Sequence, residues 1–213
     1  MRRSITFLLG LLLLSCAAHA QEKGPTLKPC EGTYDFTGSM DYLDPQYQEH
    51  IRGMERNHLN SDVENLVKGQ TTANPGGDLR FLVGNVPNHH RALAALINLA
   101  LRDHSEMPAE VGPYTVRCWL YRATVFNPSD GTPFLLYGVY LARNKLDREA
   151  LEQLQQAAKL LPNSAEVEYN LGLVHLDLKE FEVARSHAQR AYDLGFPLPG
   201  LRRRLESAGF PLK

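Results

Sequence analysis

The sequence has few of the motifs that carry catalytic chemistry. It contains no HExxH, CxxC or GxSxG, and no glycine-rich loop leads into GKS or GKT. Metal-dependent hydrolysis, serine-type catalysis and phosphate binding each depend on one of these arrangements, because the reacting groups must be held at a fixed spacing. We therefore predict that the chain is not an enzyme and binds no metal or other cofactor.

A strong excess of charge is also missing. The 213 residues include 23 Lys and Arg against 24 Asp and Glu, a formal charge of −1. The first twenty residues hold Arg2 and Arg3 and no acid, so without them the balance is slightly more acidic. Proteins that bind nucleic acid present concentrated positive charge to its phosphates. This balance therefore argues against a nucleic-acid partner.

Long apolar runs are confined to the N-terminus. A basic start is followed by an apolar run from Ile5 to Leu14, and a small-x-small cleavage pattern ends at Ala20. We predict a secretory signal peptide over residues 1–20 and a periplasmic mature chain. No other stretch approaches eighteen apolar residues, so we expect no transmembrane span.

A second interpretation of the same segment involves Cys16. The sequence LLSC that ends at this residue resembles a bacterial lipobox, in which the cysteine is acylated and becomes the mature N-terminus. The chain would then be lipid-anchored in the envelope instead of free in the periplasm.

Two cysteines remain in the mature chain, Cys30 and Cys118. An even number of cysteines in an oxidising compartment favours a disulfide, which would fasten the N-terminal region to the first complete repeat described below. The alternative is two independent thiols, with Cys118 buried beside Trp119 as a small hydrophobic side chain.

A period of about 34 residues organises the second half of the chain. Residues 131–164 align with residues 165–198, and Gly138 and Gly172 occupy the same offset in an apolar helix. Four prolines close successive segments at spacings of 41, 34 and 35 residues: Pro87, Pro128, Pro162 and Pro197. Such spacing is typical of stacked helix pairs.

These features resemble the tetratricopeptide repeat, an αα-hairpin that buries its apolar face by stacking on a neighbour. The resemblance covers residues 88–198, in units of 88–130, 131–164 and 165–198, and implies an all-α helical solenoid. The usual pattern is broken at several positions: Phe134, Leu154, Glu168, Ala188 and Phe196. The stretches DLRFLVGNVPNHHRAL and AYDLGFPLPGL are also similar to those of exported bacterial tetratricopeptide proteins, some of them lipid-anchored, with no established activity.

The segments outside the repeats are expected to be an arm and accessory helices. Residues 21–44 lack any period and are predicted to be an extended arm, residues 45–87 to hold accessory helices, and residues 199–213 to form a capping helix. Asp44 is expected to cap the first accessory helix, which runs to about Arg56.

Two further accessory helices are expected before the repeats. Asn60 and its neighbours should cap a short helix that stops at Gly69, followed by a loop over residues 71–77. Asp78 is then expected to cap a helix that ends at Pro87. In the repeat pattern this is a second helix whose first helix is missing or degenerate.

The first complete unit has an unusually long turn. Its first helix is expected over residues 88–103, with Asn88 as the cap and His90 packed against the preceding helix. The long turn leads to a second helix over Tyr114–Phe126, and such an insertion is cheap because loop-closure entropy grows only slowly with length.

The resemblance also implies a binding face. In tetratricopeptide stacks the first helices line a concave surface that holds extended or helical peptides. The outward positions here are Arg91, Asn98 and Arg102 in the first unit, Leu135, Val139 and Arg143 in the second, and Tyr169, Asn170, Leu173 and Asp177 in the third. Arginines on such a face suit a carboxylate or a peptide backbone. The alternative is a solvated face with ordinary charges.

Histidine pairs offer a weaker candidate site. His89 and His90 are adjacent, so on a helix their side chains diverge by about 100°. His175 and His187 lie on separate helices of one repeat and could approach, but a pair falls short of the ligands that zinc requires.

We therefore predict an exported scaffold or adaptor that binds another protein or peptide in the bacterial cell envelope. Two alternatives stay open. One is an accessory lipoprotein that assists assembly of an envelope complex, and the other is a metal-handling or enzymatic envelope protein that uses His89 and His90.

Overall fold

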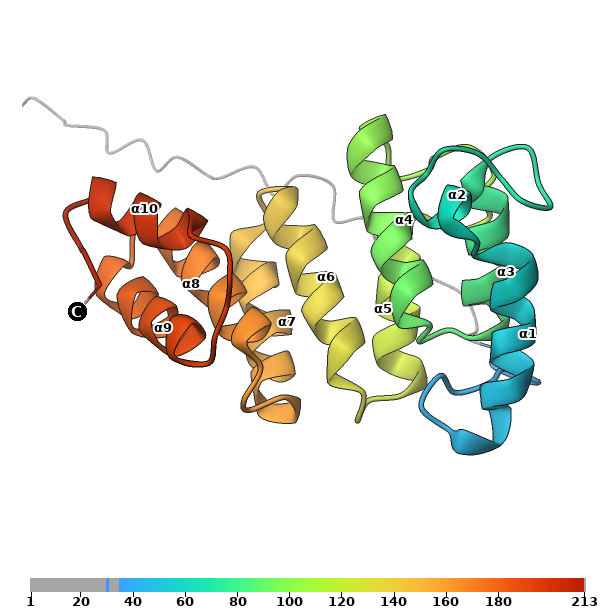
Figure 1. The fold of residues 1–213 in the computed structure, drawn as a ribbon, viewed down its shortest axis with the longest axis horizontal. Helices are drawn as coiled ribbons and strands as arrows, with labels where there is room; N and C mark the ends of the chain where they lie inside the picture. The colour runs from blue at the N-terminus through green and yellow to red at the C-terminus, as the bar shows by residue number, and fades with distance from the viewer. Residues whose placement is uncertain (1–29, 31–34, 213) are drawn as a thin grey trace, which may run out of the picture.

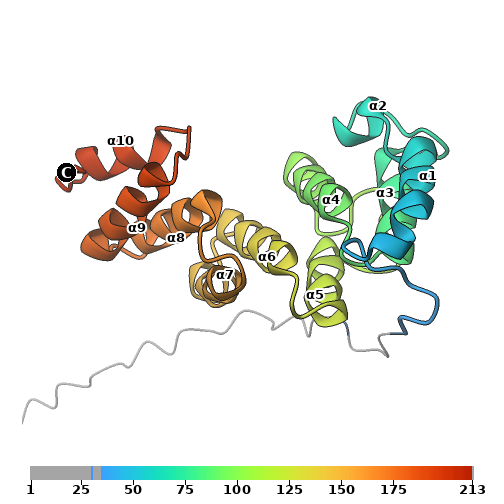
Figure 2. The ribbon, with the colours of Figure 1, turned by 60° about the horizontal axis from the view of Figure 1, so that its bottom comes forward.

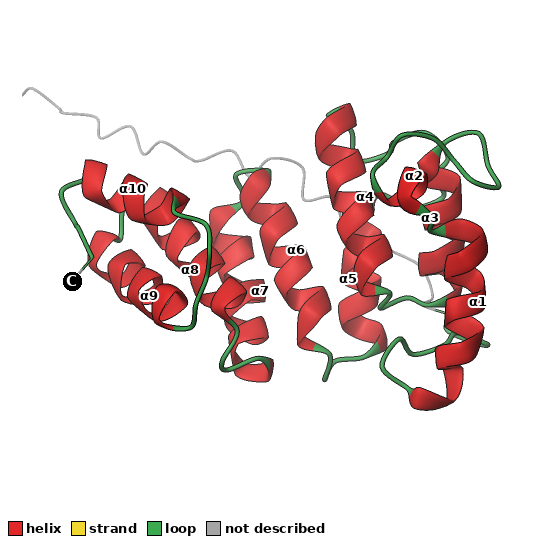
Figure 3. Cartoon of the chain, in the orientation of Figure 1, coloured by secondary structure: helices red, strands yellow, loops and turns green. Residues whose placement is uncertain are grey.

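The computed structural model describes residue 30 and residues 35–212, and all regular structure in that part is helical (Figures 1 and 3). The predicted signal peptide and Cys16 lie outside the described residues. In chain order the elements are the 3₁₀-helix η1 (Pro45–Tyr47), α1 (Gln48–His58), α2 (Ser61–Glu64), α3 (Pro75–Asn85), α4 (His90–Asp103), α5 (Val116–Phe126), α6 (Gly131–Arg143), α7 (Asp147–Leu160), α8 (Ala165–Asp177), α9 (Phe181–Asp193) and α10 (Gly200–Ser207).

The helices form antiparallel pairs stacked along the long axis of the molecule (Figure 1). The pairs α4–α5, α6–α7 and α8–α9 correspond to the three predicted units, and α10 packs on α8 and α9 at the end of the stack. Figure 2 shows α4, α6, α8 and α10 along one side of the stack, which is concave, with α5 and α7 on the other. The predicted all-α repeat solenoid is confirmed.

Two glycines at equivalent positions allow close helix contacts. A Cβ atom at Gly138 would lie 2.6 Å from Cγ of Leu154, and one at Gly172 would lie 2.5 Å from Cδ2 of Leu201. Leu154 is equivalent to Ala188 in the next repeat, so the space above Gly172 is filled by Leu201 of α10 instead. The capping helix thus completes the core of the last repeat.

The accessory region contains a further helix pair. The α1 and α3 helices lie side by side, and α3 packs on α4 as a second helix does on the next unit (Figure 1). Of the two alternatives left open for its first helix, missing or degenerate, the structure shows a helix in that place, α1, outside the regular repeat pattern. A 16-residue connection that contains α2 replaces the short turn of a regular repeat. The pair of α1 and α3 therefore does not follow the 34-residue period and could not be predicted from it.

The predicted boundaries in this region also need correction. The α2 helix ends at Glu64, not at Gly69, and α3 begins at Pro75, inside the predicted loop. Proline suits the first turn of a helix because the N–H groups there have no intrahelical acceptor. Gly76 is fixed by packing: a Cβ atom there would collide with the carbonyl oxygen of Ala109 in the connection between α4 and α5.

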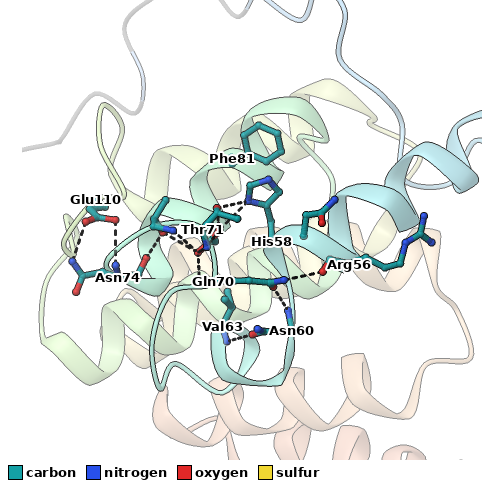
Figure 4. A network of polar contacts seen from close by, with 12 residues as sticks. Arg56, His58, Asn60, Val63, Gln70, Thr71, Asn74, Phe81 and Glu110 are labelled. Atoms are coloured by element: carbon teal, nitrogen blue, oxygen red, sulfur yellow. Dashed lines mark hydrogen bonds and ion pairs between the residues drawn. The ribbon is translucent and has the colours of Figure 1, made fainter.

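Asp78 does not cap α3 but organises the connection before it. Its side chain is fully buried and accepts hydrogen bonds from Gln70 N at 2.7 Å, from the Thr72 hydroxyl at 2.8 Å and from the hydroxyl of Thr71, and its Oδ1 lies 2.8 Å from His58 Nδ1. Figure 4 shows His58, Gln70 and Thr71 converging in this network. Burial raises the pKa of the Asp78 carboxyl, but the hydrogen bonds outweigh it and lower the pKa to about 2.

The two long connections of the stack contact each other. Asn74 Nδ2 donates to Glu110 Oε1 at 3.1 Å (Figure 4), and Arg80 Nη1 donates to the carbonyl of Gly112 at 3.1 Å. The insertions of the first two helix pairs therefore lie at the same edge of the stack and stabilise each other.

The start of α4 differs from the prediction. The N-cap is His89, whose Nδ1 accepts from Ala92 N at 3.3 Å, because Asn88 is used elsewhere. The buried Asn88 side chain donates to Asp41 at 2.8 Å and to Asp130 at 2.9 Å. The Nε2 of His90 lies 2.7 Å from the same Asp130 carboxylate, and its ring centroid lies 4.7 Å from that of Tyr42.

The N-terminal arm is attached at two places. Cys30 and Cys118 form a disulfide, as predicted, with Cα atoms 5.5 Å apart. Further along, Met40 N donates to the carbonyl of Asn85, and Tyr42 N donates to Asn88 Oδ1, both at 2.9 Å. Asp44 then caps the next segment as predicted, although that segment opens with η1.

Other boundaries shift by a few residues. The α1 helix runs to His58, two residues past the predicted end. Thr115 caps α5, so this helix starts at Val116 instead of Tyr114. Within the described residues no helix is long and apolar enough to cross a membrane.

Candidate partner-binding groove

A groove lies on the concave side between α6, α8 and the segment that leads into α10. It has a volume of about 570 Å³. Its lining residues are Val139, Ala142, Arg143 and Lys145 from the α6 side, Glu166, Tyr169, Asn170, Leu173, Val174 and Asp177 from α8, and Phe196, Leu198 and Arg204 from the C-terminal segment.

The structure brings six of the ten predicted face residues to this groove. They are Val139, Arg143, Tyr169, Asn170, Leu173 and Asp177. Leu135 lies one turn before Val139 on α6 but is buried in the hydrophobic core. Asn98 is exposed on α4 and does not line the groove.

The two predicted arginines of the first unit serve another purpose. Arg91 pairs with Glu64 and Glu55 of the accessory helices. Arg102 Nη1 donates to the carbonyl of Leu66 at 2.6 Å. The accessory region therefore binds two outward arginines of α4, and neither of them lines the groove that contains Arg143.

The C-terminal wall of the groove was missed by the sequence reasoning. The Phe196 ring stacks on Tyr169 with centroids 4.1 Å apart. The Tyr192 hydroxyl donates to the carbonyl of Leu198 at 3.0 Å and accepts from Arg202 N at 3.1 Å, which fixes the segment before α10. The one available signal was Phe196 itself, which interrupts the repeat pattern just before Pro197.

The charges in the groove are unevenly satisfied. Asp177 pairs with Arg204 and lies 3.7 Å from Lys145 Nζ. Arg143 and the carboxylate of Glu166 have no hydrogen bond or ion pair with another described residue. The groove thus combines apolar side chains with two charges that are free to meet a ligand.

A second cavity of about 520 Å³ lies between the C-terminal ends of α4 and α6. Arg143 lines both cavities, so they adjoin at this side chain. Tyr140 at the base of the second cavity donates to Glu106 Oε1 at 3.4 Å. Burial raises the pKa of the Tyr140 hydroxyl, and the nearby Glu106 carboxylate raises it further, so the hydroxyl stays a donor at neutral pH.

Each of the four candidate histidines lies close to a carboxylate. His89 Nε2 lies 3.2 Å from Glu55 and caps α4 through its other nitrogen, and His90 contacts Asp130. His175 and His187 do approach, with stacked rings 5.2 Å apart, and each contacts a carboxylate. Among the described residues no group of three or more potential ligands could hold a metal ion.

Comparisons with known proteins support the fold. No protein-family model and no curated protein sequence matches the chain. Solved structures do match: pilF of Pseudomonas aeruginosa at 20% identity and TM-score 0.53, covering 75% of this chain and 66% of that one. TTC0263, a tetratricopeptide protein of Thermus thermophilus, matches at 22% identity and TM-score 0.52, covering 78% and 82%. MamA matches at 14% identity and TM-score 0.52, covering 76% and 82%.

These likenesses define the class of fold. The chain is a tetratricopeptide-type helical solenoid, as the repeat pattern predicts. It spans 66% of the length of the pilF chain. At these low sequence identities, the likeness concerns the fold alone.

Proposed function

We propose that this protein is a scaffold or adaptor that binds a segment of another protein in the groove between α6, α8 and the C-terminal segment. The observation that carries the proposal is the groove itself, in which apolar side chains lie beside the unpaired charges of Arg143 and Glu166. Arg143 and Glu166 are both exposed, so their charges are accessible to a ligand, and a groove that offers apolar side chains together with accessible charges suits a peptide.

We further propose that the protein works outside the cytoplasm, in the cell envelope. The N-terminal sequence supports export, and the Cys30–Cys118 disulfide suits an oxidising compartment. A free periplasmic form and a lipid-anchored form differ in the mature N-terminus. The mass of the purified exported chain distinguishes acylated Cys16 from cleavage after Ala20.

Site-specific cross-linking in the native cells tests the groove. A photoreactive amino acid replaces Asn170 in the groove or, as a control, Glu152, which is exposed on α7. We expect a discrete cross-linked partner from position 170 and none from position 152. The Leu173→Asp variant, which places a charge among the apolar side chains of the groove, should remove the product.

Equal products from both positions, or a product that persists in the Leu173→Asp variant, would refute the groove as the binding site. Metal analysis of the purified protein tests the alternative that uses His89 and His90. Stoichiometric metal that is lost in a His89→Ala, His90→Ala double variant would favour that alternative.

A further inference from the structure

The two unpaired charges of the groove lie at its opposite ends. Arg143 is the last residue of α6, whereas Glu166 lies in the first turn of α8, the equivalent helix of the next repeat. Both line the groove, and neither forms an ion pair with a described residue. The groove therefore has a basic end and an acidic end.

Repeat geometry gives the separation of these ends. Arg143 follows the start of α6 at Gly131 by twelve residues, and Glu166 follows the equivalent Ala165 by one. Eleven residues of helix correspond to about 16 Å along the axis. An extended peptide advances about 3.3 Å per residue, so about five residues span this distance.

The neighbouring charges strengthen the asymmetry. At the basic end Arg204 and Lys145 both approach Asp177, so that single carboxylate already has two cationic neighbours and leaves Arg143 uncompensated. No lining residue at the other end supplies a cation to Glu166. Between the ends the lining contains Tyr169 and Asn170 and is otherwise apolar, with Val139, Leu173, Val174, Phe196 and Leu198.

We propose that the groove binds an extended protein segment in one direction, with an acidic side chain at Arg143, a basic side chain at Glu166 and apolar residues between them. This inference rests on the proposed function and adds the chemistry and the polarity of its ligand. Arginine suits the acidic end because its guanidinium binds a carboxylate through two parallel hydrogen bonds. Reversing the segment would place like charges together at both ends and weaken binding.

Selection from a random heptapeptide display library tests the proposal without knowledge of the natural partner. The bait is the full exported chain with its disulfide intact, and the affinities of the enriched peptides are measured by fluorescence anisotropy. We expect enriched peptides with an acid and a base about five positions apart in one consistent order, with apolar residues between. Scrambling that order should weaken binding about tenfold.

Charge-swap variants supply the decisive comparison. Arg143→Glu and Glu166→Arg should each weaken binding of an enriched peptide about threefold to tenfold, and the double variant should prefer the peptide with its charges exchanged. Arg148→Glu and Glu152→Arg make the same changes at exposed positions of α7 and should leave binding unchanged. Raising the salt concentration should reduce the differences in peptide affinity between the groove variants and the unchanged protein, because exposed charges are screened.

The outcomes separate this inference from the proposed function. If Leu173→Asp abolishes binding but neither charge swap affects it, the groove binds peptides without the proposed polarity, and the inference is overturned. If binding survives Leu173→Asp, both the inference and the groove assignment are wrong. Failure to enrich any peptide also overturns the inference, because a preformed bipolar groove should select one.

Discussion

Arg91 of α4 forms a two-point ion pair with Glu64 of α2. Its Nε donates to Oε1 at 2.9 Å and its Nη2 to Oε2 at 2.8 Å, while Nη1 donates to Glu55 of α1 at 3.2 Å. The hydrogen bonds to Glu64 raise the pKa of the guanidinium above its usual value, although burial opposes them. An outward arginine of the first repeat thus fastens the accessory helices.

The Arg91→Ala variant should therefore lose stability and not partner binding. Both side chains are about 40% exposed, so we expect a decrease of at most about 1 kcal/mol in the free energy of unfolding, measured with urea. An Arg143→Ala variant should show the opposite behaviour, with normal unfolding and weaker peptide binding. A large loss of binding in Arg91→Ala at unchanged stability would place the functional face on α4 instead.

The repeats were predictable because local chemistry determines them. The glycine at position 138 or 172, the alanines of the second helix and the closing proline recur within one period. Within each unit the glycine of the first helix packs against the second helix, Gly138 on Leu154 and Gly172 on the backbone of Ala184. A single sequence can therefore specify both the helices and their order along the stack.

The accessory region and part of the groove were less predictable because they depend on distant contacts. Glu64 and Arg91 are 27 residues apart in the sequence, and Asp41 and Asn88 are 47 apart. No local sequence pattern predicts such pairs. From the sequence, Arg91 was therefore expected to face a ligand, whereas it pairs with Glu64 and Glu55 of the accessory helices. The wall of the groove that contains Phe196 and Leu198 was missed for the same reason.

The lowered pKa of Asp78 should make the free energy of unfolding decrease as the pH falls into the acid range. Its folded pKa of about 2 lies below the usual value of 3.8, so its contribution is fully present above pH 4 and is lost as the pH falls toward 2. Asp78→Asn should destabilise the protein at pH 7 by about 2 to 3 kcal/mol, because the amide cannot accept all the hydrogen bonds of the buried carboxylate.

Urea unfolding at pH 7, 5 and 3 checks this prediction. The difference in free energy of unfolding between Asp78→Asn and the unchanged protein should be similar at pH 7 and pH 5 and should become smaller at pH 3. Asp62→Asn is the control, because Asp62 forms only a partly exposed ion pair with Lys68. A difference that stays constant down to pH 3 would show that the carboxylate is not the cause.

Two glycines of α3 provide a matched test of the contact between the insertions. Gly76→Ala should destabilise the protein by about 1 to 3 kcal/mol, because its Cβ atom would collide with the Ala109 carbonyl. At Gly84 a Cβ atom meets nothing within 4 Å, so Gly84→Ala should stabilise the helix by about 0.5 to 1 kcal/mol. Thermal unfolding of both variants decides the matter, and the prediction fails if their melting temperatures shift in the same direction.

The disulfide should hold only the first part of the arm. Cys30 and Cys118 enclose 88 residues of sequence, for which the loop-entropy model gives about 4 to 5 kcal/mol as an upper limit, so we expect the Cys30→Ala, Cys118→Ala double variant to lose about 2 to 4 kcal/mol. Met40 and Tyr42 are attached independently through Asn85 and Asn88. Their amides should therefore stay protected from hydrogen exchange in the double variant. Loss of that protection would mean that the disulfide, and not the buried asparagine network, holds the whole arm.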